Sequence, residues 1–494
     1  MPYDASRHGP DNRPPSAERM AAMLHHDNWY TMQRYENRTT WVLLALIAFL
    51  AVGPGLLRRL RVARPQLAAR LVSRLPGYYA LAAFCRRIGY VELGHLGFGL
   101  RMPALGATLV IVVFSAGMFI WSLVVKPWYR PSREWGSPPL AIRTAMIANA
   151  LIPFLFALSM KVNVISFLTA LSHERLQVYH QWMARLVLLL SVMHTIPFIW
   201  QPLHDAGYEN LKAWWDSDAV TNWSGVAALA IMAWMVASST RVFRNMSYEF
   251  FVIQHILSAV SFLGLYFWHT ANGLNSWIWL WATVGIWGLA TLLKWSRSAA
   301  ASQYFVNMRA SVEVGRAELG AGGGEVVRIA LRTPVKWAPG SHVFVRFPTL
   351  APLQSHPWTI VTLSSPSPHA DSQLVLVARV RGGITRVLHS HVETHATDDE
   401  ETLLRADDDD GEQGGKMRTS ACLVPAIIDG PYGASSAVVQ AFDEVVMLIG
   451  GMGITYALPT LMHLASARSI VTRHVSLVWT VRDAGAFVSE QKSG

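Results

Sequence analysis

The sequence is poor in cysteine and in charge. Only two cysteines, Cys85 and Cys422, occur in 494 residues, so a disulfide framework and a cysteine-based metal site are both excluded. Charged residues make up 15% of the chain, which is too few for an ordinary soluble enzyme. The polar, proline-rich first twenty residues contain no apolar core of the signal-peptide type. We therefore expect the first membrane span to act as its own insertion signal.

Apolar residues dominate instead, at 52% of the chain, and they are concentrated between positions 41 and 295. This distribution predicts a polytopic membrane protein with appended soluble parts. The predicted spans, each near the length that crosses the hydrocarbon core, are 41–57, 104–126, 141–160, 176–200, 224–240, 246–269 and 274–295. Four tryptophans near span ends are interpreted as interfacial anchors without a role in electron transfer: Trp128, Trp135, Trp200 and Trp223.

The charges predict the orientation of these spans. The segment after the first span carries nine arginines against one acid, Glu92, so the positive-inside rule makes it cytoplasmic. Alternation then places residues 1–40 and 201–223 outside and everything after 296 inside. The net charge of +10 is assigned to contacts with anionic membrane lipid, and nucleic acid is not expected as a partner.

Two histidine pairs repeat one interval inside the apolar region. His180 and His194 are fourteen residues apart, and so are His255 and His269. Fourteen helical steps bring each pair near one helix face, about 21 Å apart along the axis. Imidazoles in hydrocarbon are rare unless they function, and iron ligation is a common use. Two such helices would hold two stacked bis-histidine haems, His180 with His255 and His194 with His269. The alternative is that the histidines merely join helices by hydrogen bonds.

After residue 303 the pattern changes to short alternating apolar runs bounded by glycine and proline, such as EVVRIALRT and HVFVRFP. This pattern predicts a small antiparallel β-barrel or sandwich over residues 303–433. Residues 393–415 contain ten of the 32 acidic residues and few apolar ones. We expect this segment to be a disordered surface insertion.

Residues 434–494 have the pattern of a partial α/β domain. An apolar strand, Val445–Ile449, is followed by a turn with Gly450, Gly451 and Gly453 and then by an apolar helix. This arrangement can present backbone N–H groups and a helix N-terminus to a pyrophosphate, although tight turns use glycine in the same way. The next strand, HVSLVWTVRD, favours a parallel α/β unit.

Together these features resemble the fungal ferric reductase family, relatives of the NADPH oxidases, from about residue 105 to the C-terminus. Both histidine pairs match the family's haem ligands, and SHPWTI is similar to its HPF[ST] flavin-binding segment, with Trp358 in place of phenylalanine. Hydropathy and charge predict an extracytoplasmic segment (1–40) and two spans with a basic cytoplasmic loop (41–140). The resemblance adds a di-haem transmembrane domain (141–295), an FAD-binding barrel (303–433) and an incomplete NADP-binding domain (434–494). The cofactor-binding residues it implies are His356, Pro357, Trp358, Thr359, Gly382, Gly383 and Thr385 for FAD, Gly430, Pro431 and Gly433 at the junction, and Gly450, Gly451, Gly453, Ile454 and Thr455 for NADPH.

The activity that the resemblance implies is that of an NADPH-dependent ferric-chelate reductase. Electrons would pass from cytoplasmic NADPH through FAD and two haems b to Fe(III) chelates or siderophores outside, with Cu(II) as an alternative acceptor. No general acid or base is assigned, because electron transfer to a chelated metal requires none. The expected location is the plasma membrane, with the vacuolar membrane as the alternative, and a separate transporter would take up the Fe(II).

The resemblance departs at the C-terminus. The family's nucleotide domain continues to a Cys-Gly motif beside the nicotinamide, which this sequence lacks. The departure puts NADPH binding and turnover in question. Two alternative functions stand beside the reductase: a superoxide-generating NADPH oxidase, which would use O₂ as the acceptor, and, because of this departure, a catalytically impaired haem-binding paralogue.

Overall fold

The structure is a computed structural model that describes residues 31–94, 102–131, 136–302, 308–316, 325–367, 370–395, 420–467 and 471–480. The chain forms two compact units. The first consists of Met1–Val52 and Gly77–Ala290, and the second of Gly53–Pro76 and Thr291–Gly494.

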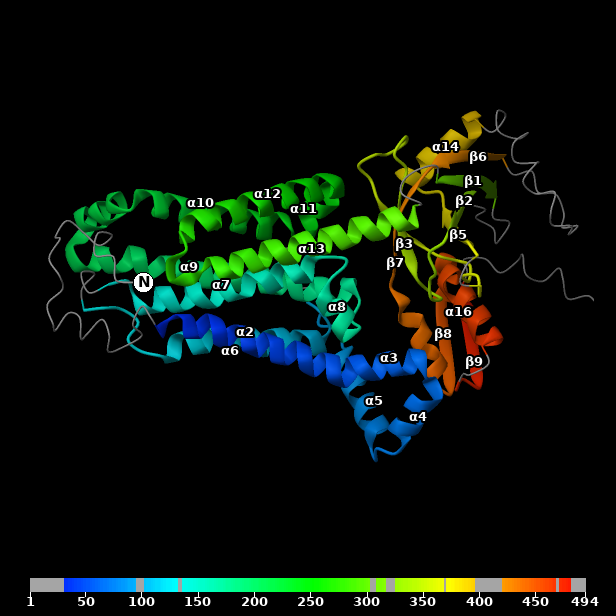
Figure 1. Cartoon of the computed structure of the whole chain (residues 1–494), viewed down its shortest axis with the longest axis horizontal. Helices are drawn as coiled ribbons and strands as arrows, with labels where there is room; N and C mark the ends of the chain where they lie inside the picture. The colour runs from blue at the N-terminus through cyan, green and yellow to red at the C-terminus, as the bar shows by residue number, and fades with distance from the viewer. Residues whose placement is uncertain are drawn as a thin grey trace, which may run out of the picture. The chain divides into compact units, whose positions relative to one another are not determined.

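The first unit is helical (Figure 1). Its helices are α2 (Gln33–Leu50), α5 (Tyr78–Gly89), α6 (Leu105–Val124), α7 (Pro139–Ser159), α8 (Val164–Thr169), α9 (His173–Ser217), α10 (Ala219–Ser238), α11 (Arg241–Met246), α12 (Tyr248–Thr270) and most of α13 (Trp277–Ala301). Among the described residues, seven helices are long and apolar enough to cross a membrane, which agrees with the seven predicted spans.

Two helices extend beyond the predicted spans. The first helix starts at Gln33 rather than 41 and continues through a π-helical turn, Ala51–Gly55, into α3 (Leu56–Ala63). The fourth helix continues to Ser217 rather than 200. The reason is physical: hydropathy marks only the part of a helix that meets hydrocarbon, whereas backbone hydrogen bonds extend the helix into polar sequence.

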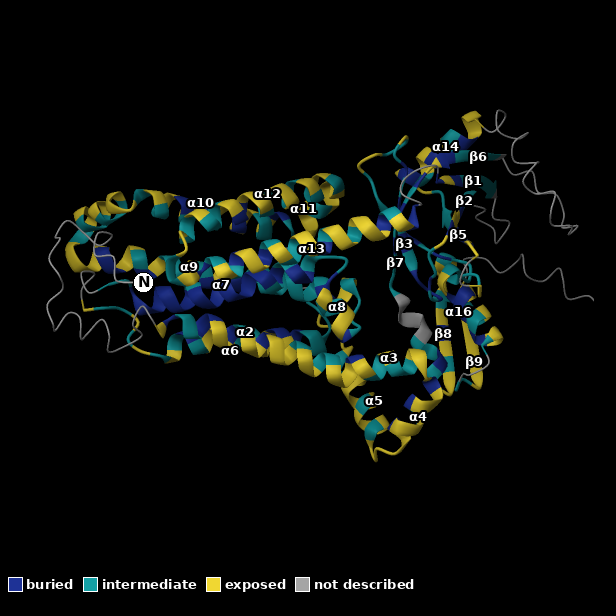
Figure 2. Ribbon diagram, viewed as in Figure 1, coloured by how far each residue is buried: buried dark blue, intermediate teal, exposed yellow. Residues whose placement is uncertain are grey.

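Helix α7 is the buried centre of this unit, as its dark colour in Figure 2 shows. It packs against α2, α6 and α9. Its Ile147 and Leu151 are fully buried and lie in one apolar cluster with Leu190 of α9. A polar contact also lies in this interior, where Asn149 Nδ2 donates a hydrogen bond to Glu36 Oε1 at 2.7 Å. Many apolar side chains of the surrounding helices are exposed, as expected of surfaces that face lipid.

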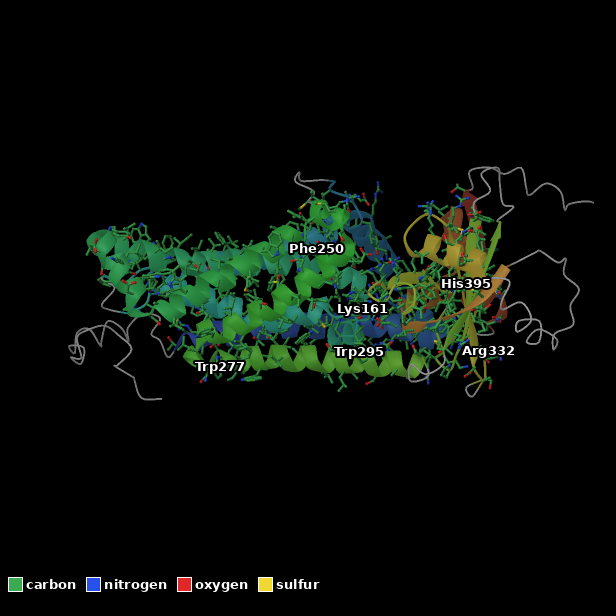
Figure 3. All side chains as sticks on the ribbon, turned by 90° about the horizontal axis from the view of Figure 1, so that it is seen from above. Lys161, Phe250, Trp277, Trp295, Arg332 and His395 are labelled. Atoms are coloured by element: carbon green, nitrogen blue, oxygen red, sulfur yellow. The ribbon has the colours of Figure 1, made fainter. Side chains whose placement is uncertain are left out.

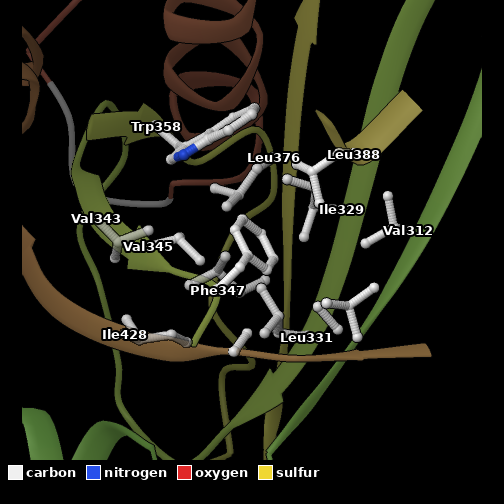
Figure 4. Packing of buried hydrophobic residues seen from close by; sticks show 14 of the residues in the cluster. Val312, Ile329, Leu331, Val343, Val345, Phe347, Trp358, Leu376, Leu388 and Ile428 are labelled. Atoms are coloured by element: carbon white, nitrogen blue, oxygen red, sulfur yellow. The ribbon is translucent and has the colours of Figure 1, made fainter. Parts of the chain in front are cut away.

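The second unit contains two antiparallel sheets, which agrees with the predicted class. The first has the strand order β5-β2-β1-β6, with β5 Ser372–Arg379, β2 Glu325–Thr333, β1 Arg309–Arg316 and β6 Ser420–Pro425. The second has the order β4-β3-β7, with β4 His356–Thr359, β3 His342–Arg346 and β7 Ile427–Tyr432. Alternate residues of β3 are buried, and its Val343 and Val345 pack with Phe347, Trp358 and Ile428 (Figure 4). Helix α14 (Ile384–His395) supplies the buried Leu388 and Val392 to the same core.

A parallel βαβ unit follows, as predicted. It consists of β8 (Glu444–Gly450), α16 (Ile454–Ser466) and β9 (His474–Thr480). Large apolar side chains of the two strands are exposed, with Leu448 at 78% and Val446 at 66%. Parallel strands are normally covered on both faces, so this small sheet is less enclosed than the antiparallel sheets before it.

Two helical segments complete the second unit. Helices α3 and α4 (Pro65–Ser73) lie against a 3₁₀ segment, Ala434–Ala441, where Gln440 Nε2 donates to the Val62 carbonyl at 2.7 Å. Trp277 and Trp295 of α13 are labelled in Figure 3. The C-terminal turns of this helix are hydrogen-bonded to β7. There Ser298 Oγ donates to the Ile428 carbonyl at 2.7 Å.

The predicted acidic insertion, 393–415, overlaps the last residues of α14, and its remainder lies outside the described residues. Residues 1–30 of the predicted extracytoplasmic segment, Trp135 and the C-terminal residues 481–494 also lie outside them.

Candidate functional site

The structure brings His194 of α9 and His269 of α12 together in the interior of the helical unit. Their imidazole centroids are 6.1 Å apart, and the ring planes are nearly perpendicular, at 81°. Two imidazoles that each bound the same metal ion at about 2 Å would have centroids up to about 6 Å apart. The observed separation is therefore compatible with one metal ion that His194 and His269 would hold together.

Backbone carbonyls fix the tautomer of three of the four predicted ligands. The Nδ1 atoms of His180, His194 and His269 each lie 2.9 Å from a carbonyl oxygen, of Leu155, Ala141 and Thr221 respectively. A carbonyl only accepts hydrogen bonds, so each Nδ1 carries the proton. Each Nε2 is then left as the unprotonated nitrogen that a metal binds.

Helix α7 supplies the carbonyl for both histidines of α9. The two carbonyls, of Leu155 and Ala141, are fourteen residues apart, and so are His180 and His194. The earlier histidine binds the later carbonyl, so α7 and α9 are antiparallel here. Because the two intervals are equal, both histidine–carbonyl hydrogen bonds can form at the same time. The helix that orients these ligands contributes none of its own.

A small residue follows each of these carbonyls by four positions: Ala145 after Ala141, Ser159 after Leu155 and Gly225 after Thr221. In a helix this is the residue whose N–H points at that carbonyl, so its side chain lies close to any further donor. At position 225 even a Cβ would be too large. A Cβ built there would lie 2.6 Å from His269 Cε1 and 2.8 Å from its Nδ1.

His255 is held differently. Its Nδ1 lies 3.4 Å from Ser239 Oγ, which donates its own proton to the Met235 carbonyl at 2.6 Å. The hydroxyl therefore accepts from Nδ1, which leaves the same tautomer as in the other three histidines. The inner pair thus has the same donor chemistry as the outer pair, but the Nδ1 hydrogen bond of His255 is longer than those of the other three histidines.

The predicted flavin-binding residues lie in β4 of the second sheet and at the start of α14. His356, Pro357, Trp358 and Thr359 form β4, in which Trp358 lies opposite Val343 and is buried. His356 Nε2 lies 3.2 Å from Gln354 Oε1.

The RGGIT segment forms the N-terminal end of α14. Thr385 Oγ1 donates to the Gly382 carbonyl at 3.0 Å and accepts from the Arg381 N–H, and Gly383 has a φ of +56°. A Cβ at Gly382 or Gly383 would meet nothing within 4 Å, so the space beside them is open. An open loop that leads into a helix N-terminus suits a phosphate, and the segment therefore fits its predicted role.

The junction glycines have a packing explanation of their own. A Cβ at Gly433 would lie 2.8 Å from His342 Nδ1, and one at Gly430 would lie 3.1 Å from Val343 Cγ1. Both glycines also have positive φ values. They let β7 approach β3 closely, whether or not a ligand is bound. Pro431 belongs to the same strand, and its carbonyl accepts from Arg297 at 3.1 Å.

Beside this junction, Tyr432 donates a hydrogen bond to Asp429, whose other carboxylate oxygen lies 4.0 Å from Lys294 Nζ. Burial, reinforced by this hydrogen bond and the nearby carboxylate charge, raises the pKa of the Tyr432 phenol well above its ordinary value. The phenol therefore remains protonated and donates throughout the physiological range.

The predicted nucleotide-binding residues occupy the turn between β8 and α16. Gly450, Gly451 and Gly453 lead into α16, which begins at Ile454. Thr455 Oγ1 donates to the Met452 carbonyl at 2.9 Å, and Trp479 Nε1 of β9 donates to the Gly451 carbonyl at 3.0 Å. The turn thus has the strand–turn–helix form that the sequence predicted.

Two family models match the chain. Residues 144–266 match the ferric reductase like transmembrane component, a range that includes His180, His194 and His255 and ends before His269, and residues 311–436 match an FAD-binding domain. The chain belongs to the fungal ferric reductase family. It is an integral membrane protein with an FAD-binding domain.

Similar curated proteins carry names of the same kind. A probable cell surface ferric reductase of Aspergillus oryzae is 33% identical over 413 residues, which are 81% of this chain and 50% of that protein. Ferric/cupric reductase transmembrane component 7 of Saccharomyces cerevisiae is 30% identical over 413 residues, 81% of this chain and 60% of that protein. The chain thus spans about half to three fifths of the length of these relatives.

Sequence reasoning identified the histidines but missed the groups that orient them. The carbonyls of Ala141, Leu155 and Thr221 carry no side-chain signal. The only sequence signal for these carbonyls is the small residue four positions later, above all Gly225. This signal can be interpreted only when the partner helix is known.

Proposed function

We propose that the chain transfers electrons across the membrane, from NADPH in the cytoplasm through FAD and two haems b to Fe(III) chelates on the other side. One observation carries the proposal. The imidazole rings of His194 and His269 lie 6.1 Å apart, and each Nδ1 lies 2.9 Å from a backbone carbonyl, which leaves each Nε2 unprotonated and able to bind a metal. His180 and His255 offer the same donor chemistry fourteen residues away on the same two helices.

In the proposal, haem iron supplies one-electron transfer and the flavin converts a two-electron hydride donation into single electrons. The protein's own residues hold the ligands in a single tautomer and surround them with apolar side chains. FAD would be held by His356, Pro357, Trp358 and Thr359, and its phosphates by Gly382, Gly383 and Thr385. NADPH would be held at Gly450, Gly451, Gly453, Ile454 and Thr455.

The acceptor class is inferred from the relatives, which are named ferric and ferric/cupric reductases. We infer Fe(III) in a chelate or siderophore, with Cu(II) as an alternative, and release of Fe(II) to a separate transporter. The arginine-rich segment after the first span supports a cytoplasmic second unit. We place the protein in the plasma membrane; a vacuolar location would keep the same topology, with the lumen as the outside.

The test is haem reduction in membranes that contain this chain, kept under nitrogen. Reduced b-type bands after addition of NADPH, followed by their loss on addition of ferric citrate, are the expected result. Bands that form only with dithionite would contradict NADPH as the donor and indicate a haem protein without turnover. Superoxide outside the membrane in air, without added iron and without ferric reduction, would indicate an oxidase.

A further inference from the structure

The outer end of α9 folds back on itself. The helix is broken at Ala206 and Gly207, where Gly207 has a φ of 76° and a ψ of −164°, a conformation open only to glycine. Asn210 Nδ2, after the break, donates to the Pro202 carbonyl at 2.9 Å before it. Trp214, after the break, stacks on Phe198, before it, with ring centroids 5.6 Å apart and planes 6° from parallel. The break therefore returns an aromatic side chain to the level of the outer histidines.

A continuous series of ring contacts starts at His194. Its imidazole lies 5.2 Å from the Phe198 ring, edge to face, and Phe198 stacks on Trp214. Trp214 is followed by Trp215 at 6.4 Å, and Trp215 by Trp223 at 5.2 Å. All these centroid separations lie within the range of aromatic pairs in contact. The series ends at a side chain that is 63% exposed, Trp223.

A second aromatic group on the same helix provides a contrast. Trp200 stacks on His204 at 4.6 Å and contacts Tyr129 at 4.5 Å. Neither contact leads to His194. Trp200 is 44% exposed, and its role as an interfacial anchor stays a prediction. Trp223 was interpreted in the same way, but its ring contacts connect it to the outer pair.

We propose that Phe198, Trp214, Trp215 and Trp223 form the exit route through which electrons pass from the outer histidine pair to an acceptor at the exposed face of Trp223. This inference rests on the proposed function. Each step of the reaction moves one electron: the metal held by His194 and His269 is oxidised by one unit, and chelated Fe(III) is reduced to Fe(II). No bond forms and no proton moves. The rings provide contiguous π-electron density in place of water or aliphatic gaps, and none of them has to hold a charge.

The experiment uses the full chain in membranes, reduced with a stoichiometric amount of dithionite under nitrogen. Reoxidation of the haem bands by ferric citrate is followed by stopped-flow absorbance over a range of citrate complex concentrations. Trp214→Leu is expected to lower the limiting rate about tenfold, equivalent to roughly 1.4 kcal/mol of barrier. Trp214→Phe, which keeps a ring in the stack, and Trp200→Leu, which removes a ring outside the series, should both retain the wild-type limiting rate.

Two further readouts separate conduction from folding and docking. The haem content and the reduced spectrum of each variant should match the wild type, and the near-UV circular dichroism of the haem-free chain should change in Trp214→Leu because stacked rings are lost. If Trp214→Leu loses haem, Trp223→Leu at the exposed end replaces it. A higher half-saturating concentration at an unchanged limiting rate would show docking rather than conduction, and would overturn the exit route. A wild-type chain whose bands ferric citrate does not reoxidise would instead overturn the proposed function itself.

Discussion

The two histidine pairs share one spacing and one donor chemistry, yet the hydrogen bonds that orient their imidazoles differ in partner and length. In the outer pair, both imidazoles bind backbone carbonyls at 2.9 Å, and Gly225 makes room for one ring. In the inner pair, His180 binds a carbonyl at 2.9 Å, whereas His255 reaches a serine hydroxyl at 3.4 Å. Carbonyls of a helix are fixed by its hydrogen bonds, but a hydroxyl rotates. The inner pair therefore depends on a side chain where the outer pair depends on backbone.

The largest effect expected from this difference is at Gly225. Gly225→Ala places a Cβ against the His269 ring, so the imidazole must leave the Thr221 carbonyl. We expect the outer haem to bind about 100-fold more weakly, at the upper end of the range for groups that orient metal ligands. The haem-to-protein ratio and the reduced spectrum measure it. Gly264→Ala on α12 is the matched control, because a Cβ there meets nothing within 4 Å. Full haem content in Gly225→Ala would show that the Thr221 contact does not orient His269.

Ser239→Ala tests the weaker contact. Without the hydroxyl, His255 loses its only recorded Nδ1 partner in the described structure, and the inner haem should bind about tenfold more weakly, at the lower end of the same range. Haem titration of the purified chain measures this loss. Ser191→Ala is the control, since its hydroxyl donates within its own helix to the Val187 carbonyl at 2.9 Å. An equal effect of both changes would contradict a specific role for Ser239.

A smaller effect is expected at Ala145, four residues after the carbonyl that binds His194. Ala145→Val adds two methyl groups where a Cβ is already accommodated, so the ring should shift rather than leave. We expect the outer haem to bind more weakly by less than about tenfold, below the range for outright loss of an orienting group, and the inner haem to be unchanged. Ser159→Val should have the converse selectivity, because it follows the Leu155 carbonyl of the inner pair. Difference spectra that resolve the two haems would detect either result, and loss of both haems in one variant would contradict the pairing.

The smallest effect concerns the second unit, where the Tyr432 hydroxyl donates a hydrogen bond to another side chain, the Asp429 carboxylate. The raised pKa of Tyr432 means that the folded state favours the protonated phenol. Its stabilisation is complete below the pKa of an unfolded tyrosine, about 10, and is lost as the pH rises above that value. The thermal midpoint of the full chain should therefore fall above about pH 10, and fall less in Tyr432→Phe. Identical pH profiles would show that Tyr432 does not contribute.

Much of this architecture could be predicted from the sequence, for definite physical reasons. Apolar length predicts the spans, and alternation predicts the sheets of the second unit. The repeated interval of histidines in hydrocarbon predicts the haem ligands, and that role stays a prediction. The ends of α2 and α9 could not be predicted, because helix continues into polar sequence. Nor could the aromatic series from Phe198 to Trp223, which depends on the reversal of α9 at Gly207. The pairing of α7 with α9 was hidden as well, because backbone carbonyls look alike in every sequence.

The pairing of the four histidines is tested by the haem content of the wild type, the four single histidine-to-alanine variants and the two paired double variants. We predict two haems per wild-type chain and one in every single variant. His180→Ala and His255→Ala should lose the same haem by spectrum and potential, and their double variant should lose no more. His194→Ala and His269→Ala should behave alike for the other haem. Two haems retained in any single variant, or a double variant of one predicted pair that loses both haems, would contradict it.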